Sequence, residues 1–168
     1  MVRSLLVFTF ALMSGFSIHA QDSIGNIQKK KVLLAYEQTE FKTALIKQMV
    51  SILKKDSIES VVIEHSNGAL DKENPANYGA IFISNSGVNS QIRPWIVEWL
   101  KKNEKYSSII ILHTTQTSNW KVETTVDAVT SASIKNKVKS LAAKYVEMIK
   151  KRLNSTQQLP SSDEEQKN

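Results

Sequence analysis

The 168-residue chain contains no cysteine and only five glycines. The lack of cysteine excludes disulfide bonds, thiolate metal sites and cysteine nucleophiles. Dinucleotide-binding and Walker-type phosphate loops both need clustered glycines. Because the five glycines are far apart, the sequence excludes both loops. An apolar fraction of 41% and a charged fraction of 23% are typical of a globular domain.

The formal net charge of +6 is modest for this length. The basic residues are not interleaved with aromatic residues or glycines, as nucleic-acid binding requires, so no nucleic-acid partner is expected. Most of the excess lies in the last amphipathic segment, where a solvated helix face is the simplest interpretation and binding to a membrane or polyanion is the alternative.

The N-terminus has the features of a secretory signal peptide. Arg3 is basic, residues 5–13 are apolar except for one threonine, and Ala20 precedes a polar stretch. The apolar run is shorter than the roughly 20 residues that span a bilayer. We therefore expect residues 1–20 to be a signal peptide, with an uncut N-terminal anchor as the alternative. The product is expected to be periplasmic or secreted, without stable membrane insertion after cleavage.

The rest of the chain alternates short apolar runs with amphipathic segments. Continuous apolar runs are typical of strands buried on both faces, and alternation with helices favours a parallel sheet. The predicted strands are 32–36, 58–63, 80–83, 108–112 and 126–129, and the predicted helices are 41–53, 92–100 and 134–153. Lys42, Lys47 and Lys54 are expected on the exposed side of the first helix. The predicted fold is an α/β domain over 31–153 with strand order 2-1-3-4-5, followed by a disordered polar tail over 154–168.

Ligands of such sheets bind beyond the carboxyl ends of the strands. The segments at that edge are 37–41, 65–68, 84–91, 113–117 and 127–133. The functional residues are therefore expected in these segments.

Two stretches resemble the flavodoxin-like superfamily. Residues 32–36, followed by a threonine-bearing turn, resemble its first strand and phosphate loop, and 81–84 with 94–100 resemble its third strand and next helix. The resemblance implies a flavodoxin-like three-layer sandwich that binds FMN and transfers electrons. It implies cofactor contacts from Thr39 in the phosphate loop and from Ser84, Asn85 and Ser86 after the third strand.

The phosphate loop also departs from the flavodoxin pattern Ser/Thr-x-Thr-Gly-x-Thr. Residues 37–42 read Glu-Gln-Thr-Glu-Phe-Lys, so Thr39 alone matches, and Glu37 and Glu40 put carboxylates where a dianion would bind. Acidic residues are also simply favourable at a helix N-terminus. No aromatic residue follows the third strand to stack on the flavin. These departures favour an alternative function, a cofactor-less binding or scaffold module outside the cytoplasm.

The segment 127–133, Asp-Ala-Val-Thr-Ser-Ala-Ser, is similar to the Asp-x-x-(Ser/Thr)-Gly-Ala-(Thr/Ser) segment of exported FMN-binding domains. In those domains a flavin transferase attaches FMN to the last hydroxyl through a phosphoester. The matching positions are Asp127, Thr130, Ala132 and Ser133, with Ser131 in place of glycine. The resemblance implies FMN on Ser133 and a redox partner at the membrane. The alternative is an ordinary helix cap made by Ser131 or Ser133.

Two further interpretations involve the histidines after the second and fourth strands, His65 and His113. Neither has a companion at metal-binding spacing, so both are expected to be structural and no metal is predicted. A serine hydrolase would use Ser84 or Ser86 as nucleophile and His113 as base, oriented by Asp127 or Glu37. The chain lacks the G-x-S-x-G motif of many such enzymes.

Overall fold

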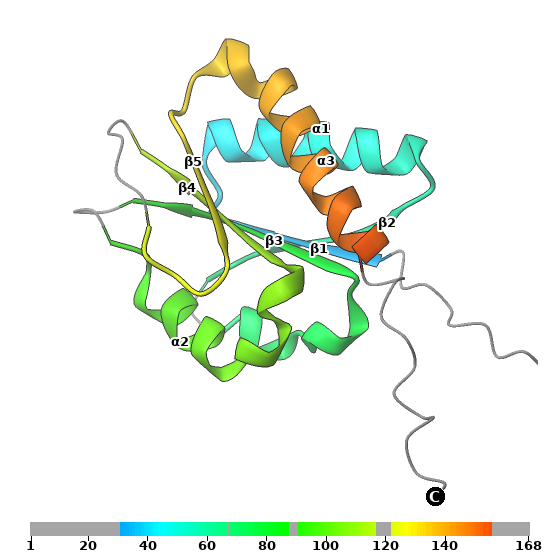
Figure 1. The fold of residues 1–168 in the computed structure, drawn as a ribbon. Coiled ribbons are helices and arrows are strands. Elements are labelled where there is room, and N and C mark those ends of the chain that lie inside the picture. The colour runs from blue at the N-terminus through cyan, green and yellow to red at the C-terminus, as the bar shows by residue number, and fades with distance from the viewer. Residues whose placement is uncertain (1–30, 67, 88–90, 117–121, 156–168) are drawn as a thin grey trace, which may run out of the picture.

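The computed structural model describes residues 31–66, 68–87, 91–116 and 122–155. The predicted signal peptide and all but the first two residues of the predicted tail lie outside these ranges. The described residues form one sheet of five parallel strands in the order β2-β1-β3-β4-β5, which confirms the predicted fold class (Figure 1). The strands are β1 (Lys31–Tyr36), β2 (Glu59–Glu64), β3 (Ala80–Ser86), β4 (Ile110–Thr115) and β5 (Asp127–Ser131).

Helices cover both faces of this sheet, which gives three layers (Figure 1). Helices α1 (Glu40–Lys55) and α3 (Val138–Ser155) pack together on one face. Helix α2 (Pro94–Lys102) and the 3-10 turns η1 (Leu70–Lys72), η2 (Pro75–Asn77) and η3 (Glu104–Ile109) lie on the other side of the sheet. A further turn, η4 (Lys135–Lys137), leads into α3. In the described part of the chain, no helix combines the length and apolar character needed to cross a bilayer.

The core divides into two clusters because successive strand residues face opposite sides of the sheet. Even-numbered β1 and β3 residues such as Leu34 and Phe82 pack against α1 and α3, whereas odd-numbered ones such as Leu33 and Ile81 pack against the α2 side. Strands β1, β3 and β4 are buried almost throughout. The apolar runs in the sequence are therefore strands covered on both faces.

Strands β3 and β4 continue beyond their apolar runs. They were predicted to end at residues 83 and 112, and this is wrong by three residues in each case. The parallel ladder pairs Asn85 with Thr114 and Ser86 with Thr115, so polar residues expected in loops belong to the sheet. The last helix also begins later than predicted, at Val138, because a 3-10 turn precedes it.

The expected exposure of Lys42 is wrong. Its side chain is only 1% exposed. Lys42 is three residues before Leu45 and seven before Met49, so the helical period of 3.6 places it on the buried face of α1. A cation at this position requires a buried polar environment, which the end of the sheet supplies.

We predict that Leu45→Ala lowers the free energy of unfolding by about 2–5 kcal/mol, because the side chain is fully buried between α1 and the sheet and its loss leaves a cavity. Urea denaturation would measure the change. Lys47→Ala, on the exposed side of the same helix, is the matched control and should stay within about 0.5 kcal/mol of the wild type. Equal losses in both variants would contradict the assigned face of α1.

Candidate functional site at the carboxyl edge of the sheet

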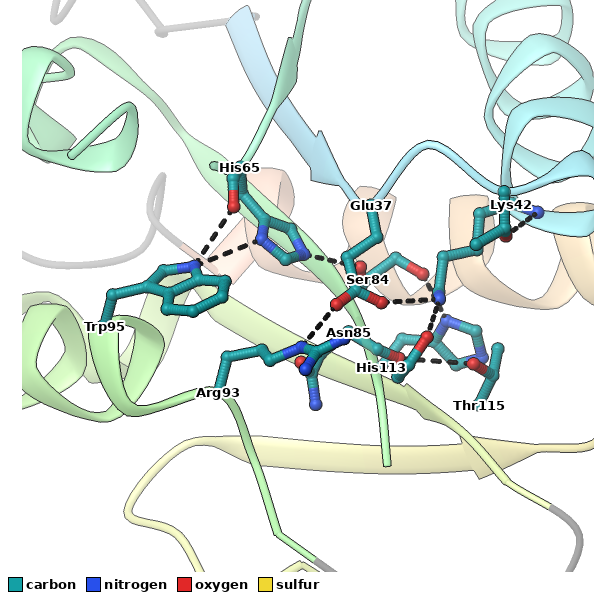
Figure 2. Close-up of polar contacts among 11 residues, drawn as sticks. Glu37, Lys42, His65, Ser84, Asn85, Arg93, Trp95, His113 and Thr115 are labelled. Atoms are coloured by element: carbon teal, nitrogen blue, oxygen red, sulfur yellow. Dashed lines mark hydrogen bonds and ion pairs between the residues drawn. The ribbon is translucent and has the colours of Figure 1, made fainter. Parts of the chain in front are cut away.

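The carboxylate of Glu37 lies at the carboxyl end of β1 and contacts side chains from both helix layers (Figure 2). Its Oε2 accepts a hydrogen bond from Lys42 Nζ of α1 at 3.0 Å, and its Oε1 accepts one from Nε of Arg93, just before α2, at 2.6 Å. Lys42 Nζ also donates to the hydroxyl of Ser86 at the end of β3. One carboxylate therefore joins α1, β1 and the start of α2.

These contacts determine the charge states of the cluster. Burial by itself would raise the pKa of Glu37, but hydrogen bonds from Ser86, Arg93 and Lys42 outweigh it and hold that pKa at about 2. Burial lowers the pKa of Lys42, and Glu37 opposes this shift by favouring the ammonium form. Glu37 is thus ionised at neutral pH. With Lys42 and Arg93 charged, the cluster carries one net positive charge.

A second polar chain runs across β3, β4 and β5 beneath α3. The fully buried His113 ring contacts Ser84 Oγ through Nδ1 at 2.8 Å and Ser131 Oγ through Nε2 at 2.9 Å. Ser131 in turn is hydrogen-bonded to Tyr145 of α3. Burial, with a smaller contribution from the nearby Lys42, lowers the pKa of His113 to about 3. The ring is therefore neutral, with one nitrogen donating and the other accepting.

This chain does not fit the serine hydrolase interpretation. Ser84 and His113 are in contact, but both have 0% exposed surface, so no substrate could reach the hydroxyl. The second ring nitrogen of His113 faces Ser131 rather than either of the expected carboxylates. The contact stabilises the packing of β3 against β4 instead.

His65 belongs to the other side of the site, where it links β2 to β3 and α2. Its Nε2 lies 2.9 Å from the carbonyl oxygen of Ser84, and because a carbonyl only accepts, Nε2 carries the proton. The indole N–H of Trp95 donates to the backbone oxygen of His65 at 3.1 Å (Figure 2). His65 therefore acts as a buried structural link. The described residues contain no group of three histidine, aspartate or glutamate side chains able to hold a metal ion.

Asn85 and Thr114 are neighbours across β3 and β4 on the α2 side of the sheet. Both are fully buried, and within the described structure neither the amide atoms of Asn85 nor the hydroxyl of Thr114 has a hydrogen-bond partner. A buried polar group without a partner costs about 1–3 kcal/mol. The carboxyl edge therefore holds polar atoms that the described residues do not satisfy.

The segment with the FMN-attachment resemblance forms β5 and the turn after it. Asp127, at its start, forms an ion pair with Arg152 of α3, and Ser131 is held by His113. Ser133 is exposed in the turn beyond the strand. The predicted alternative of a helix cap is wrong, because η4 is preceded by Ile134, which makes no side-chain cap bond, and α3 starts only at Val138.

The other predicted site residues are divided between these groups. Thr39 caps α1, with its hydroxyl accepting from the backbone N–H of Lys42 at 3.3 Å. Ser86 joins the Glu37 cluster, Ser84 and Ser131 join the His113 chain, and Thr130 pairs with Thr114 in the sheet. Arg93 and Lys42 were not predicted to be residues of the site. The helical period could have indicated Lys42, but nothing in the local sequence indicates that Arg93 reaches Glu37, 56 positions away.

No protein-family model matches the chain, and no curated protein has a matching sequence. Solved structures do match. The flavodiiron protein from Giardia intestinalis aligns with a TM-score of 0.52 at 11% identity, over 75% of this chain and 36% of that one. The Flv1 flavodiiron core from Synechocystis has a TM-score of 0.52 at 11% identity, over 77% and 37%. Flavodoxin 2 from Bacillus cereus has a TM-score of 0.49 at 10% identity, over 70% and 99%.

The fold is flavodoxin-like. At these identities the likeness concerns the fold alone, and this chain spans little more than a third of the length of the two flavodiiron proteins.

The turn between β1 and α1 does not fit the phosphate of a non-covalently bound FMN. The cations that could hold a phosphate, Lys42 and Arg93, are already bound to the Glu37 carboxylate. Thr39, the one matching residue, uses its hydroxyl to cap α1. A dianion would meet a carboxylate that stays ionised, and like charges at such short range repel.

We predict that Glu37 makes stability depend on pH in the acid range. Its pKa is about 2 in the folded chain against an ordinary value of 4.5, so its contribution is complete above pH 4.5 and is lost as the pH falls towards 2. The difference in unfolding free energy between wild type and Glu37→Gln should shrink by about 3 kcal/mol from pH 6 to pH 2. Urea denaturation at each pH measures it. Glu40→Gln, which removes one carboxylate from an exposed ion pair, is the matched control for the loss of an acidic residue from the same turn.

We also predict that His113 does not take up a proton in the folded protein above about pH 4, since its folded pKa is about 3. Two-dimensional NMR of the ring nitrogens would show the neutral form down to that pH, whereas the same ring in urea should titrate near its ordinary value of 6.5. Because the folded pKa is lowered, this histidine removes stability as the pH falls below 6.5. A folded-state midpoint near 6.5 would contradict the buried His113 chain.

Proposed function

We propose that this protein is an exported flavodoxin-like module that carries FMN on Ser133 and exchanges electrons with a partner at the membrane. The observation that carries the proposal is the exposed Ser133 hydroxyl in the turn at the carboxyl end of β5. A phosphoester at Ser133 fixes the FMN phosphate covalently, so the turn closed by Glu37 is not needed for phosphate binding. When bound, FMN supplies one- and two-electron redox chemistry.

The surroundings of Ser133 support this assignment. Lys135, two residues later, pairs with Glu40 at the start of α1 at 2.7 Å, which ties the turn to the edge of the sheet where flavodoxin-like proteins bind ligands. Strand β5 is at the edge of the described sheet, so one side of its backbone is not paired with another of the described strands. A modifying enzyme could therefore approach the strand and the turn from that side.

The replacement of glycine by Ser131 is compatible with the folded segment. Ser131 pairs with Thr115 in the ladder, and among the described residues other than glycine only Ser57 has a positive φ. The folded strand thus needs no glycine at this position. Ser131 instead supplies the hydroxyl that contacts His113.

The location and the partner remain parts of the proposal. Export rests on the signal-like residues 1–20, which predict a periplasmic or secreted protein. A flavin transferase acting there would take FMN from a flavin adenine dinucleotide. Ser133 Oγ would bond to the FMN-side phosphorus, the pyrophosphate P–O bond would break, and AMP would leave with the proton of the Ser133 hydroxyl. The membrane redox partner follows from the resemblance to exported FMN-binding domains.

We predict that the protein purified from its native host has the mass of the mature chain plus one FMN less one water, together with flavin absorption bands. Intact-mass spectrometry and visible spectra after denaturing dialysis measure both. Ser133→Ala should lose the added mass and the colour while remaining folded. Ser140→Ala, which removes an exposed hydroxyl from α3, should retain both. A Ser133→Ala protein that kept covalent flavin would exclude this attachment site.

A second candidate is the cofactor-less binding module outside the cytoplasm. It is favoured by the closed Glu37 cluster and by the amide of Asn85 at the carboxyl edge, which has no partner among the described residues. The same measurement distinguishes the two functions, since a colourless chain of unmodified mass from the native host supports the second. A flavin that absorbs but dialyses away would contradict both candidates, because it would show non-covalent binding despite Glu37.

A further inference from the structure

Three donors from separate elements converge on the Glu37 carboxylate or its immediate neighbour (Figure 2). Lys42 Nζ lies 3.0 Å from Oε2, Arg93 Nε lies 2.6 Å from Oε1, and the Ser86 hydroxyl contacts the same Lys42 ammonium. An ammonium, a guanidinium and a hydroxyl are the groups with which proteins bind phosphate, sulfate and carboxylate ions. The donors thus form an oxyanion site whose occupant is part of the chain.

The burial of Lys42 makes an occupant necessary. Its side chain is 1% exposed, and removal of one partner from a buried ion pair leaves an uncompensated charge. The side chain of Glu37 is 16% exposed, so the place that it fills lies next to solvent and can be reached by an ion from solution when the carboxylate is removed. Any variant without the Glu37 carboxylate leaves two neighbouring cations that attract an external anion.

We propose that Glu37 is a built-in anion that fills an oxyanion site made by Lys42, Arg93 and Ser86. While the carboxylate is in place, the site rejects free phosphate and phosphate-bearing ligands. Without it, the same three side chains bind a free oxyanion such as inorganic phosphate. This inference does not depend on whether Ser133 carries FMN.

The charge balance explains the direction of the effect. With Glu37 present, Lys42 and Arg93 share one negative charge, and a phosphate dianion at the same place would meet an ionised carboxylate. With Glu37 removed, the Arg93 guanidinium has no carboxylate, and the buried Lys42 loses the anion that favours its ammonium form. A bound oxyanion would supply that negative charge again. Glu40 does not have this role, because its exposed carboxylate pairs with the exposed Lys135.

The test compares Glu37→Ala with the wild type, both as full exported chains in a Ser133→Ala background, so that no covalent flavin enters the result. Inorganic phosphate is titrated against each protein by calorimetry, and the thermal midpoint is followed in phosphate and in chloride of equal ionic strength. We expect Glu37→Ala to bind phosphate at least tenfold more tightly than the wild type does. Its thermal midpoint should rise with phosphate concentration, because a ligand bound only by the folded state stabilises that state.

Two sets of controls assign the binding to these side chains. Glu37→Ala combined with Lys42→Met or with Arg93→Gln should lose the phosphate binding, since each double variant removes one cation of the site. Glu40→Ala removes the same charge from the neighbouring position and should gain none. Binding by Glu40→Ala equal to that of Glu37→Ala would mean that net charge alone attracts phosphate, which would overturn the proposal.

The remaining outcomes also decide the matter. Equal phosphate affinity in wild type and Glu37→Ala would show that Glu37 does not fill the site, and a folded Glu37→Ala without phosphate binding would show that the donors form no oxyanion site. If Glu37→Ala is unfolded in chloride, its refolding in phosphate of equal ionic strength supports the proposal, and failure to refold in phosphate contradicts it. Glu37→Asp, which keeps a carboxylate, should fold and resemble the wild type, and phosphate binding by this variant would count against the built-in anion.

Discussion

The ion pairs of Glu37 are the constraint on which the carboxyl edge of this protein depends. They join Lys42, a cation from the first turn of α1, to Arg93, a cation at the start of α2, across the end of β1. A lysine near a helix N-terminus is unfavourable for the helix dipole, and a buried lysine needs a partner. The Glu37 carboxylate supplies the negative charge that offsets both effects. It also occupies the turn between β1 and α1, which is the turn that binds phosphate in flavodoxins.

This pairing distinguishes the turn between β1 and α1 from the flavodoxin phosphate-loop pattern, although the fold is flavodoxin-like. The sheet, its order and its two covering layers are flavodoxin-like, whereas Thr39, the one residue that matches the flavodoxin phosphate-loop pattern, caps a helix. A covalent phosphate at Ser133 and a cofactor-less edge are both compatible with such a turn, whereas non-covalent FMN is not.

The polar ends of β3 and β4 show how the edge stays ordered without apolar side chains. On the α3 side, Ser84, His113 and Ser131 satisfy one another in a neutral chain. On the α2 side, the side chains of Asn85 and Thr114 are buried without partners among the described residues, which lowers the free energy of unfolding. These groups lie at the carboxyl ends of the strands, which is where ligands of parallel α/β sheets bind.

By itself, the sequence determined the strand order and the two-sided core, because runs such as 32–36 and 80–83 can be buried only inside a doubly covered sheet. The motif at 127–133 also led to the prediction that Ser133 is an FMN attachment site. The helical period also places Lys42 on the buried face of α1. The tertiary structure alone decided the pairing of Glu37 with Arg93 and the extension of β3 and β4 through polar residues. The physical reason is the distance along the sequence. Periodicity within one segment shows which face of that element is buried. Ion pairs and strand ends depend on residues that are far apart in the sequence and that only folding brings together.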